Sequence, residues 1–334
     1  MAQTNGASGV VAVGASAGGV EALTRMAANL SPDLPYAVLV VLHMPANAPS
    51  VLARILDRAG PLPATRAVDG AALQAGTIYV AVPDRHLMVD DHHVILSEGP
   101  TENGHRPAIN ALFRSVALAF GQRAVGVLLS GVLDDGVLGA AAIKTRNGAT
   151  IAQSQDDALF PTMPTNAVEA GVIDHVAAAS DTGGLIKQLT GRVVEEREMD
   201  ADKSMELENR IAMARPFSID FNTEALGPPS GYICPDCKGS LTAVSDGNFR
   251  CRVGHAWTAD ALLHARDREV EGALWIAVRS LQEKAKLSRR LAERVGSGVT
   301  ADRYTELADE AEHALRVLSE RLSDANQLTK EDRG

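Results

Sequence analysis

Short apolar runs alternate with helix-like patterns over the first 190 residues. The runs at 10–13 and 37–42 are apolar at every position, so strands formed there would bury both faces. Strands of this kind lie in parallel sheets that helices cover on both sides. Further strands are expected at 77–82, 93–96, 124–129 and 150–152, and helices at 20–29, 110–120 and 139–146. The alternation predicts an α/β domain with a mostly parallel sheet and helices on both faces.

Charged residues become more frequent beyond residue 190. Residues 192–214 are rich in Glu, Asp, Arg and Met, which indicates an exposed helix or a charged linker, and a break in regular structure is expected at Leu226-Gly227-Pro228-Pro229-Ser230-Gly231. Two long helical patterns follow at 260–295 and 300–325. Apolar residues in the second pattern recur at steps of three and four, which predicts an antiparallel helical hairpin that packs against a partner. They are Tyr304, Leu307, Ala311, Ala314 and Leu318.

These patterns divide the chain into four expected parts. They are an α/β domain at 1–190, a charged helix and linker at 191–231, a small cysteine-bearing segment at 232–258 and a helical hairpin tail at 259–334. The apolar stripe of the tail needs a covering surface, which we expect to be the α/β domain, a second copy of the chain or a separate regulatory partner.

Composition narrows the class of protein. The 334 residues are 46% hydrophobic but only 4% aromatic, so Ala, Val, Leu and Ile must fill the core. The 42 acidic residues exceed the 32 basic ones, which argues against a nucleic-acid binder and against attraction to anionic membranes. Neither a secretory signal nor an apolar run long enough for a transmembrane segment is apparent. Three cysteines, an odd number, favour a reducing, cytoplasmic location.

A glycine-rich turn follows the first expected strand. Gly14-Ala15-Ser16-Ala17-Gly18 matches G-x-S-x-G between a strand and a helix, where the glycines permit a sharp turn and expose the serine hydroxyl. The amides that open the following helix can bind a developing oxyanion. A simple helix N-cap is the alternative for Ser16. A dinucleotide site fits poorly, because serine stands where that fingerprint needs glycine.

Two more polar positions follow expected parallel strands. His43 comes directly after the second all-apolar run, and Asp134 and Asp135 follow a later one. Carboxyl ends of parallel strands share one edge of the sheet, where His43 can reach Ser16 and an aspartate can orient the imidazole. The residues themselves do not separate Asp134 from Asp135, and ordinary loop residues are the alternative for both positions. The order Ser, His, Asp differs from that of the α/β-hydrolases, so that fold is not expected.

An ordered set of motifs runs from about residue 10 to about residue 189. It comprises residues 10–21, 42–45, 79–86, 104–110, 126–136, 163–164 and 167–171. Together these motifs resemble the catalytic domain of the CheB-type protein-glutamate methylesterases of bacterial chemotaxis. The resemblance implies a serine esterase with the catalytic triad Ser16, His43 and Asp135, and it favours Asp135 over Asp134 because Asp135 precedes Gly136. It implies no cofactor for catalysis.

The resemblance also implies a function in signal transduction. The expected reaction is hydrolysis of glutamate methyl esters on methylated chemoreceptors or similar proteins, with deamidation of glutamines as a second activity. The family often has methionine before the aspartate, its backbone amide serving the oxyanion hole; Val132 stands there in this chain, and a backbone role tolerates that change. His105 and Arg106 are candidates for contact with an acidic receptor helix, and ordinary loop residues are the alternative. We expect no receiver domain ahead of Ser16, and the alternative hypothesis is a non-catalytic signalling adaptor that retains the esterase fold.

All three cysteines belong to one further pattern. Cys234 and Cys237 form C-x2-C, and Cys251 and His255 form C-x3-H after an interval of 13 residues. Three thiolates and one imidazole suit a structural Zn²⁺ with no open position for catalysis. Three reduced cysteines in a small hairpin are the alternative. Because the pattern lies far from Ser16 in the sequence, we expect esterase activity of the first 190 residues to be independent of it.

Overall fold

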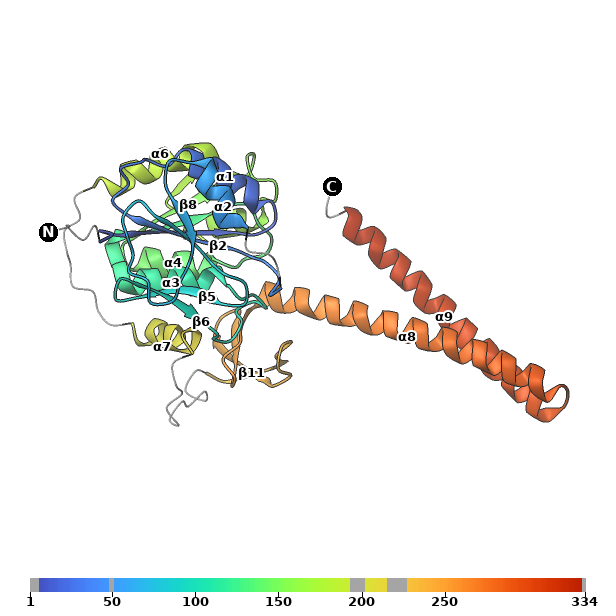
Figure 1. The fold of residues 1–334 in the computed structure, drawn as a ribbon. Helices are drawn as coiled ribbons and strands as arrows, with labels where there is room; N and C mark the ends of the chain where they lie inside the picture. The colour runs from blue at the N-terminus through green and yellow to red at the C-terminus, as the bar shows by residue number, and fades with distance from the viewer. Residues whose placement is uncertain (1–5, 48–50, 193–201, 215–226, 332–334) are drawn as a thin grey trace. The chain divides into compact units, whose positions relative to one another are not determined.

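The fold is described from a computed structural model, which describes residues 6–47, 51–192, 202–214 and 227–331. The chain divides into two compact units, Met1–Leu262 and Leu263–Gly334 (Figure 1). Parts of the expected linker, 193–201 and 215–226, lie outside the described residues.

A seven-stranded parallel sheet forms the centre of the first unit, in the order β3-β4-β2-β1-β7-β8-β9. The central strands β1, β2 and β7 are almost entirely buried, as expected for runs that are apolar at every position. The expected α/β fold with a parallel sheet is confirmed. The strands are β1 Val10–Ala15, β2 Ala37–Leu42, β3 Ala64–Arg66, β4 Ile78–Val80, β7 Ala124–Leu128, β8 Ala149–Gln153 and β9 His175–Ala177.

Helices cover both faces of this sheet (Figure 1). Val11 and Val13 of β1 pack in one core cluster with residues of α1, α2 and α6, while Val10 and Ala12 pack in the other with α3, α4 and α5. This alternation follows from the two-residue period of a strand. The helices are α1 Gly19–Ala28, α2 Leu52–Ala59, α3 Ile109–Phe120, α4 Val137–Thr145, α5 Thr162–Glu169 and α6 Ala179–Thr190, with a 3-10 turn at Gly121–Arg123.

Two sequence expectations need correction. The strand expected at 93–96 lies in β6 (His93–Ser97), which pairs antiparallel with β5 (His86–Asp90) outside the parallel sheet. The helix expected to be exposed within 192–214 is α7 (Lys203–Ala212), and its last residues are buried with residues of α3. Charged residues dominate its sequence, so the short apolar contact at its carboxyl end was not apparent from the pattern.

Residues 229–258 form four short antiparallel strands and the turns between them, and we call this segment the Cys/His sheet. The strands are β10 Pro229–Ile233, β11 Ser240–Ser245, β12 Asn248–Cys251 and β13 Ala256–Thr258.

Two long helices, α8 (Ala259–Val295) and α9 (Val299–Glu331), form the expected hairpin. In the second unit Arg289 of α8 pairs with Asp309 and Glu312 of α9, at 2.5 and 3.0 Å. No helix among the described residues combines the length and the apolar character needed to cross a membrane.

Candidate active site

Ser16 lies in the turn between β1 and α1. Gly18, the N-cap of α1, has a φ of 69°, a left-handed conformation that favours glycine and allows the tight turn. The Ser16 amide donates to the Ser130 carbonyl at 2.9 Å, which joins the turn to the segment that follows β7. The strand–turn–helix context expected from the glycine-rich motif is therefore present, and the hydroxyl stands at the carboxyl edge of the sheet.

His43 lies beside Ser16 because β1 and β2 are neighbours. The His43 amide donates to the Ala15 carbonyl at 3.1 Å, which extends the parallel pairing by one residue. The imidazole Nδ1 then lies 3.2 Å from the Ser16 hydroxyl oxygen. This distance suits a hydroxyl that donates to an unprotonated ring nitrogen, as a general base requires.

Asp135 completes a chain of three side chains. Its Oδ2 lies 2.7 Å from His43 Nε2, and the carboxylate also accepts from the amides of Ile109 and Asn110 at the start of α3, at 2.7 and 3.1 Å. Burial alone would raise the pKa of Asp135, but the hydrogen bond and charge of His43 together with these contacts hold it below its usual value. A carboxylate that stays ionised in this position can orient the imidazole and stabilise its protonated form.

The neighbouring aspartate has a different environment. Asp134 does not contact His43 but accepts a hydrogen bond from the Thr258 hydroxyl at 2.9 Å. Burial, together with the charge of Asp135, raises the pKa of Asp134 to about 6 despite this hydrogen bond. Gly136, with a φ of 103°, turns the chain between Asp135 and α4, and this conformation strongly favours glycine. The structure therefore places Asp135, and not Asp134, against the histidine.

His105 lies beside His43, and the sequence did not predict this position. Its ring stacks on that of His43 with centroids 3.8 Å apart and planes 9° from parallel. No local pattern signals this contact, because 62 positions separate the two histidines in the sequence. Arg106, a candidate for receptor contact, pairs with Asp84 at 2.6 Å and donates to the carbonyls of Glu98 and Gly99. Its contacts are those of a loop-stabilising residue.

Exposed apolar side chains lie close to the serine turn. A side chain at Gly18 would touch Leu159 and Phe160, which are 66% and 41% exposed. Val132, in the segment before Asp135, is 41% exposed. Among the backbone hydrogen bonds of the described residues, none is donated by the Val132 amide. The Ser16 turn and the segments beside it thus bring together the Ser16 hydroxyl, the Val132 amide, which has no backbone acceptor among the described residues, and exposed apolar surface.

The Cys/His sheet brings its four candidate ligands together. The ligand atoms of Cys234, Cys237, Cys251 and His255 all lie within 4.8 Å of one another. The Cys237 and Cys251 sulfurs are 3.6 Å apart, and His255 Nδ1 lies 3.7 and 3.4 Å from the Cys234 and Cys251 sulfurs. Tetrahedral zinc with Zn–S bonds of about 2.3 Å separates two sulfurs by roughly 3.8 Å. The spacing therefore fits a tetrahedral metal site, and the three thiols are free of disulfides.

The fold and the site define a class: an α/β protein with a Ser-His-Asp site at the carboxyl edge of a parallel sheet. A family model described as CheB methylesterase matches residues 11–186, and the chain belongs to this family.

Individual relatives agree with this assignment. The protein-glutamate methylesterase/protein-glutamine glutaminase 3 of Anaeromyxobacter dehalogenans is 44% identical over 171 residues, 51% of this chain and 50% of the relative. The Treponema pallidum protein-glutamate methylesterase/protein-glutamine glutaminase is 36% identical over 189 residues, 55% of this chain and 47% of the relative. The chain thus spans about half the length of the curated relatives it matches.

A solved structure supports the same family. The crystal structure of the Thermotoga maritima CheB methylesterase catalytic domain matches with a TM-score of 0.52 and 29% sequence identity. The match covers 54% of this chain and 98% of that domain. The family-model match ends at residue 186, so the Cys/His sheet and the helical hairpin lie outside it.

Proposed function

We propose that the protein is a protein-glutamate methylesterase that acts through Ser16, His43 and Asp135. The observation that carries this proposal is the continuous contact from the Ser16 hydroxyl through His43 to Asp135, within a domain of the CheB methylesterase family. The names of its relatives supply the substrate class, a glutamate methyl ester on a protein.

The first half of the reaction transfers the acyl group to the enzyme. The Ser16 oxygen attacks the ester carbonyl carbon while His43 Nδ1 takes the hydroxyl proton. The carbon–methoxy bond then breaks, and the same proton leaves on methanol. The Val132 amide and the amides that open α1 are the candidates for binding the oxyanion. The product is a glutamyl ester of Ser16.

The second half returns the enzyme to its starting state. Water gives a proton to His43 and attacks the carbonyl carbon of the acyl-enzyme, and the bond to the Ser16 oxygen breaks. The serine takes the proton back, and a free glutamate side chain leaves. Asp135 keeps Nε2 of His43 protonated throughout, so that Nδ1 stays available as the base. No step needs a cofactor.

The same site supports deamidation of glutamine as a second activity. An amide carbonyl accepts the same attack, and His43 delivers its proton to the amide nitrogen as the carbon–nitrogen bond breaks, so that ammonia leaves in place of methanol. The names of the relatives include a glutaminase, which favours this extension.

We further propose that the substrates are methylated chemoreceptors or similar signalling proteins in the cytoplasm. Three reduced cysteines suit that compartment. Val132, Leu159 and Phe160 give the serine turn an apolar border on which a protein segment can lie.

We also assign two roles outside the family match. Cys234, Cys237, Cys251 and His255 hold a structural zinc ion, as their mutual distances support. Helices α8 and α9 bind a regulatory or targeting partner. Exposed apolar side chains of α8 support this role: Trp275 is 52% exposed and Ile276 is 64% exposed.

Methanol release from a methylated receptor fragment tests the proposed activity. The purified full chain should release methanol, and Ser16→Ala should release none above background. Ser180→Ala, a change at an exposed serine of α6, should behave as the unchanged protein. A full chain that folds and binds the fragment without releasing methanol would support the non-catalytic adaptor instead.

A further inference from the structure

One loop connects the triad to the Cys/His sheet. Residues 99–108, which we call the His105 loop, carry the ring that stacks on His43. On its other side the loop pairs with β13: the Asn103 amide donates to the Ala256 carbonyl at 2.8 Å, and the Ala256 amide donates to the Thr101 carbonyl at 3.2 Å. The loop is therefore held between the catalytic histidine and a strand that the family match does not include.

Thr258, the last residue of β13, makes a second connection. Its amide donates to the Asn103 side-chain oxygen at 2.9 Å, and its hydroxyl donates to Asp134 at 2.9 Å. Asp134 precedes Asp135, whose carboxylate contacts His43. One buried threonine of the Cys/His sheet thus fixes both the His105 loop and the loop that carries the triad aspartate.

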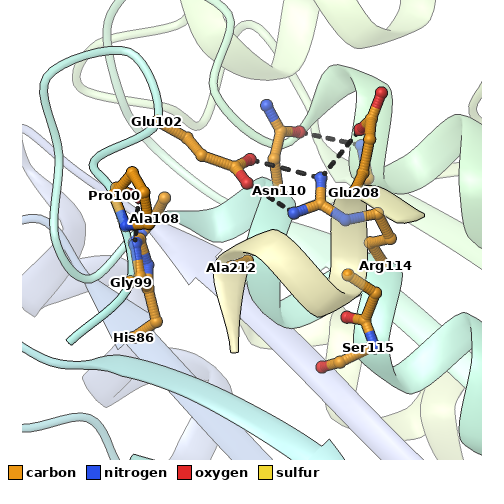
Figure 2. Close-up of polar contacts among 12 residues, drawn as sticks. His86, Gly99, Pro100, Glu102, Ala108, Asn110, Arg114, Ser115, Glu208 and Ala212 are labelled. Carbon is orange, nitrogen blue, oxygen red and sulfur yellow. Dashed lines mark hydrogen bonds and ion pairs between the residues drawn. The ribbon is translucent and has the colours of Figure 1, made fainter. Parts of the chain in front are cut away.

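A buried ion cluster joins the His105 loop to α3 and α7 (Figure 2). The Arg114 guanidinium of α3 pairs with Glu102 of the His105 loop and, at 3.3 Å, with Glu208 of α7. Arg250 of β12 joins the cluster, 3.4 Å from Glu208 and 3.9 Å from Glu102. Glu102, Arg114 and Arg250 are at most 5% exposed, so little solvent screens these charges. The cluster ties the Cys/His sheet to the base of the His105 loop.

His86 anchors the two ends of the loop. It is fully buried in β5, its Nε2 donates to the Pro100 carbonyl at 2.9 Å, and its Nδ1 accepts from the Ala108 amide at 3.2 Å (Figure 2). With the ends fixed at His86 and the middle fixed at β13, the His105 loop has little freedom. The position of its ring against His43 therefore depends on the Cys/His sheet.

We propose that the Cys/His sheet is a structural part of the esterase site, and that Thr258 is a positioning residue for the His43–Asp135 pair. Thr258 acts through Asp134 and Asn103 and touches none of the reacting atoms. This inference rests on the proposed esterase function, and it departs from the expectation that residues 1–190 act independently of the cysteine pattern. Sequence distance suggested independence, but the contacts of β13 argue against it.

Substitutions at Thr258 in the full-length protein test the proposal. Thr258→Val keeps the branched shape and removes the hydroxyl, and we expect kcat for ester hydrolysis to fall by about 5- to 30-fold, the range that one lost hydrogen bond predicts. KM should change less than about twofold, because the residue does not contact substrate. Thr258→Ser keeps the hydroxyl and should restore most of kcat.

A double-mutant cycle with Asp134 separates positioning from general destabilisation. Asp134→Ala removes the acceptor of the same hydrogen bond, so the pair Thr258→Val and Asp134→Ala should lose little more kcat than one change alone. If the losses of kcat in the two single variants multiplied in the double variant, the proposal would be overturned. An Asp134→Ala protein with unchanged kcat would also overturn it, and this test remains available if Thr258→Val fails to fold. Absence of ester hydrolysis in the unchanged protein would instead overturn the proposed function.

Discussion

The parallel sheet and the Cys/His sheet are stabilised in different ways. Strands β1, β2 and β7 are almost wholly buried and carry little except Ala, Val, Leu and Gly. In the Cys/His sheet only a few side chains are buried, among them Leu241, Trp257 and two of the candidate metal ligands. The first sheet buries enough apolar surface to form a core, whereas the second buries little and would depend on the proposed zinc ion and on contact with its neighbours.

This difference bears on function as well as on stability. The large sheet supplies the strand ends that carry Ser16, His43 and Asp135, and its rigidity fixes their separations. The Cys/His sheet supplies no triad residue, yet it holds the His105 loop and Asp134 in place. A segment that buries few apolar side chains and touches the proposed active site is a natural point at which activity can be altered.

Changes to Ser16, His43 and Asp135 should have the largest effects on kcat for ester hydrolysis. They should leave the Cys/His sheet unchanged. His43→Gln and Asp135→Asn should each lower kcat strongly, by on the order of 10⁴-fold, with Ser16→Ala and His43→Gln the most severe. Asp134→Asn should be mild by comparison, because Asp134 does not contact His43. Steady-state methanol release measures each rate. If Asp134→Asn abolished activity and Asp135→Asn did not, the assignment of the third triad member would be wrong.

Removal of a ligand of the proposed zinc ion should affect the Cys/His sheet first. Cys234→Ser should lower zinc from about one ion per chain, because a structural zinc site uses four ligands. Hydrogen exchange should then accelerate in β10–β13 while β1, β2 and β7 stay protected. Asp246→Asn, a change at an exposed turn residue of the same sheet, should alter neither the zinc content nor the hydrogen exchange of these strands. Metal analysis that finds no zinc in reduced protein would remove the metal from the account.

Breaking the buried ion cluster should weaken the connection between the two sheets. Glu102→Gln leaves Arg114 and Arg250 without full compensation, so the free energy of unfolding should fall by about 2–4 kcal/mol near neutral pH. Glu98→Gln, which removes a largely exposed pair with Arg85, should cost less than about 1 kcal/mol. Denaturant titration measures both values.

The destabilisation caused by Glu102→Gln should depend on pH. Burial disfavours the Glu102 carboxylate, but Arg114 and Arg250 hold its pKa below the usual value. The ionised form therefore stabilises the fold above the unfolded pKa of about 4.3, and this contribution disappears as pH falls. The difference in the free energy of unfolding between Glu102→Gln and the unchanged protein should therefore become smaller below about pH 4. A difference that stayed constant from pH 7.5 to pH 4 would show that the charge of Glu102 is not its cause.

The smallest effect is expected for Asp134→Asn, which should raise the free energy of unfolding rather than lower it. The pKa of Asp134 is raised to about 6, mainly by burial, so its ionisation opposes folding as pH rises through the interval between its unfolded and folded pKa values. Asp134→Asn keeps an acceptor for Thr258 and removes this cost. It should stabilise the protein by on the order of 1 kcal/mol at pH 7.5 and have little effect at pH 4. Thermal unfolding at the two pH values tests the sign; destabilisation at pH 7.5 would contradict it.

The sequence predicted that Ser16, His43 and Asp135 lie together, but it did not predict the residues around them. Ser16, His43 and Asp135 each follow an apolar strand, so the geometry of a parallel sheet predicts their meeting at one edge. The contacts of His105 with His43 and of Thr258 with Asp134 join segments 62 and 124 positions apart, and no periodic pattern marks either of them. The three-residue strands β3 and β9 were also not predicted, because so short a segment carries no recognisable period.

The central claim is that Ser16 is the nucleophile of an ester hydrolase, and covalent labelling tests it most directly. An organophosphorus ester probe reacts with an activated serine, so mass spectrometry of the treated full-length protein should find the adduct on the peptide that contains Ser16. The labelled fraction should rise in step with the loss of methanol release, and His43→Gln should slow the labelling. Loss of activity with the adduct elsewhere, or methanol release that persists with Ser16 fully labelled, would contradict the account.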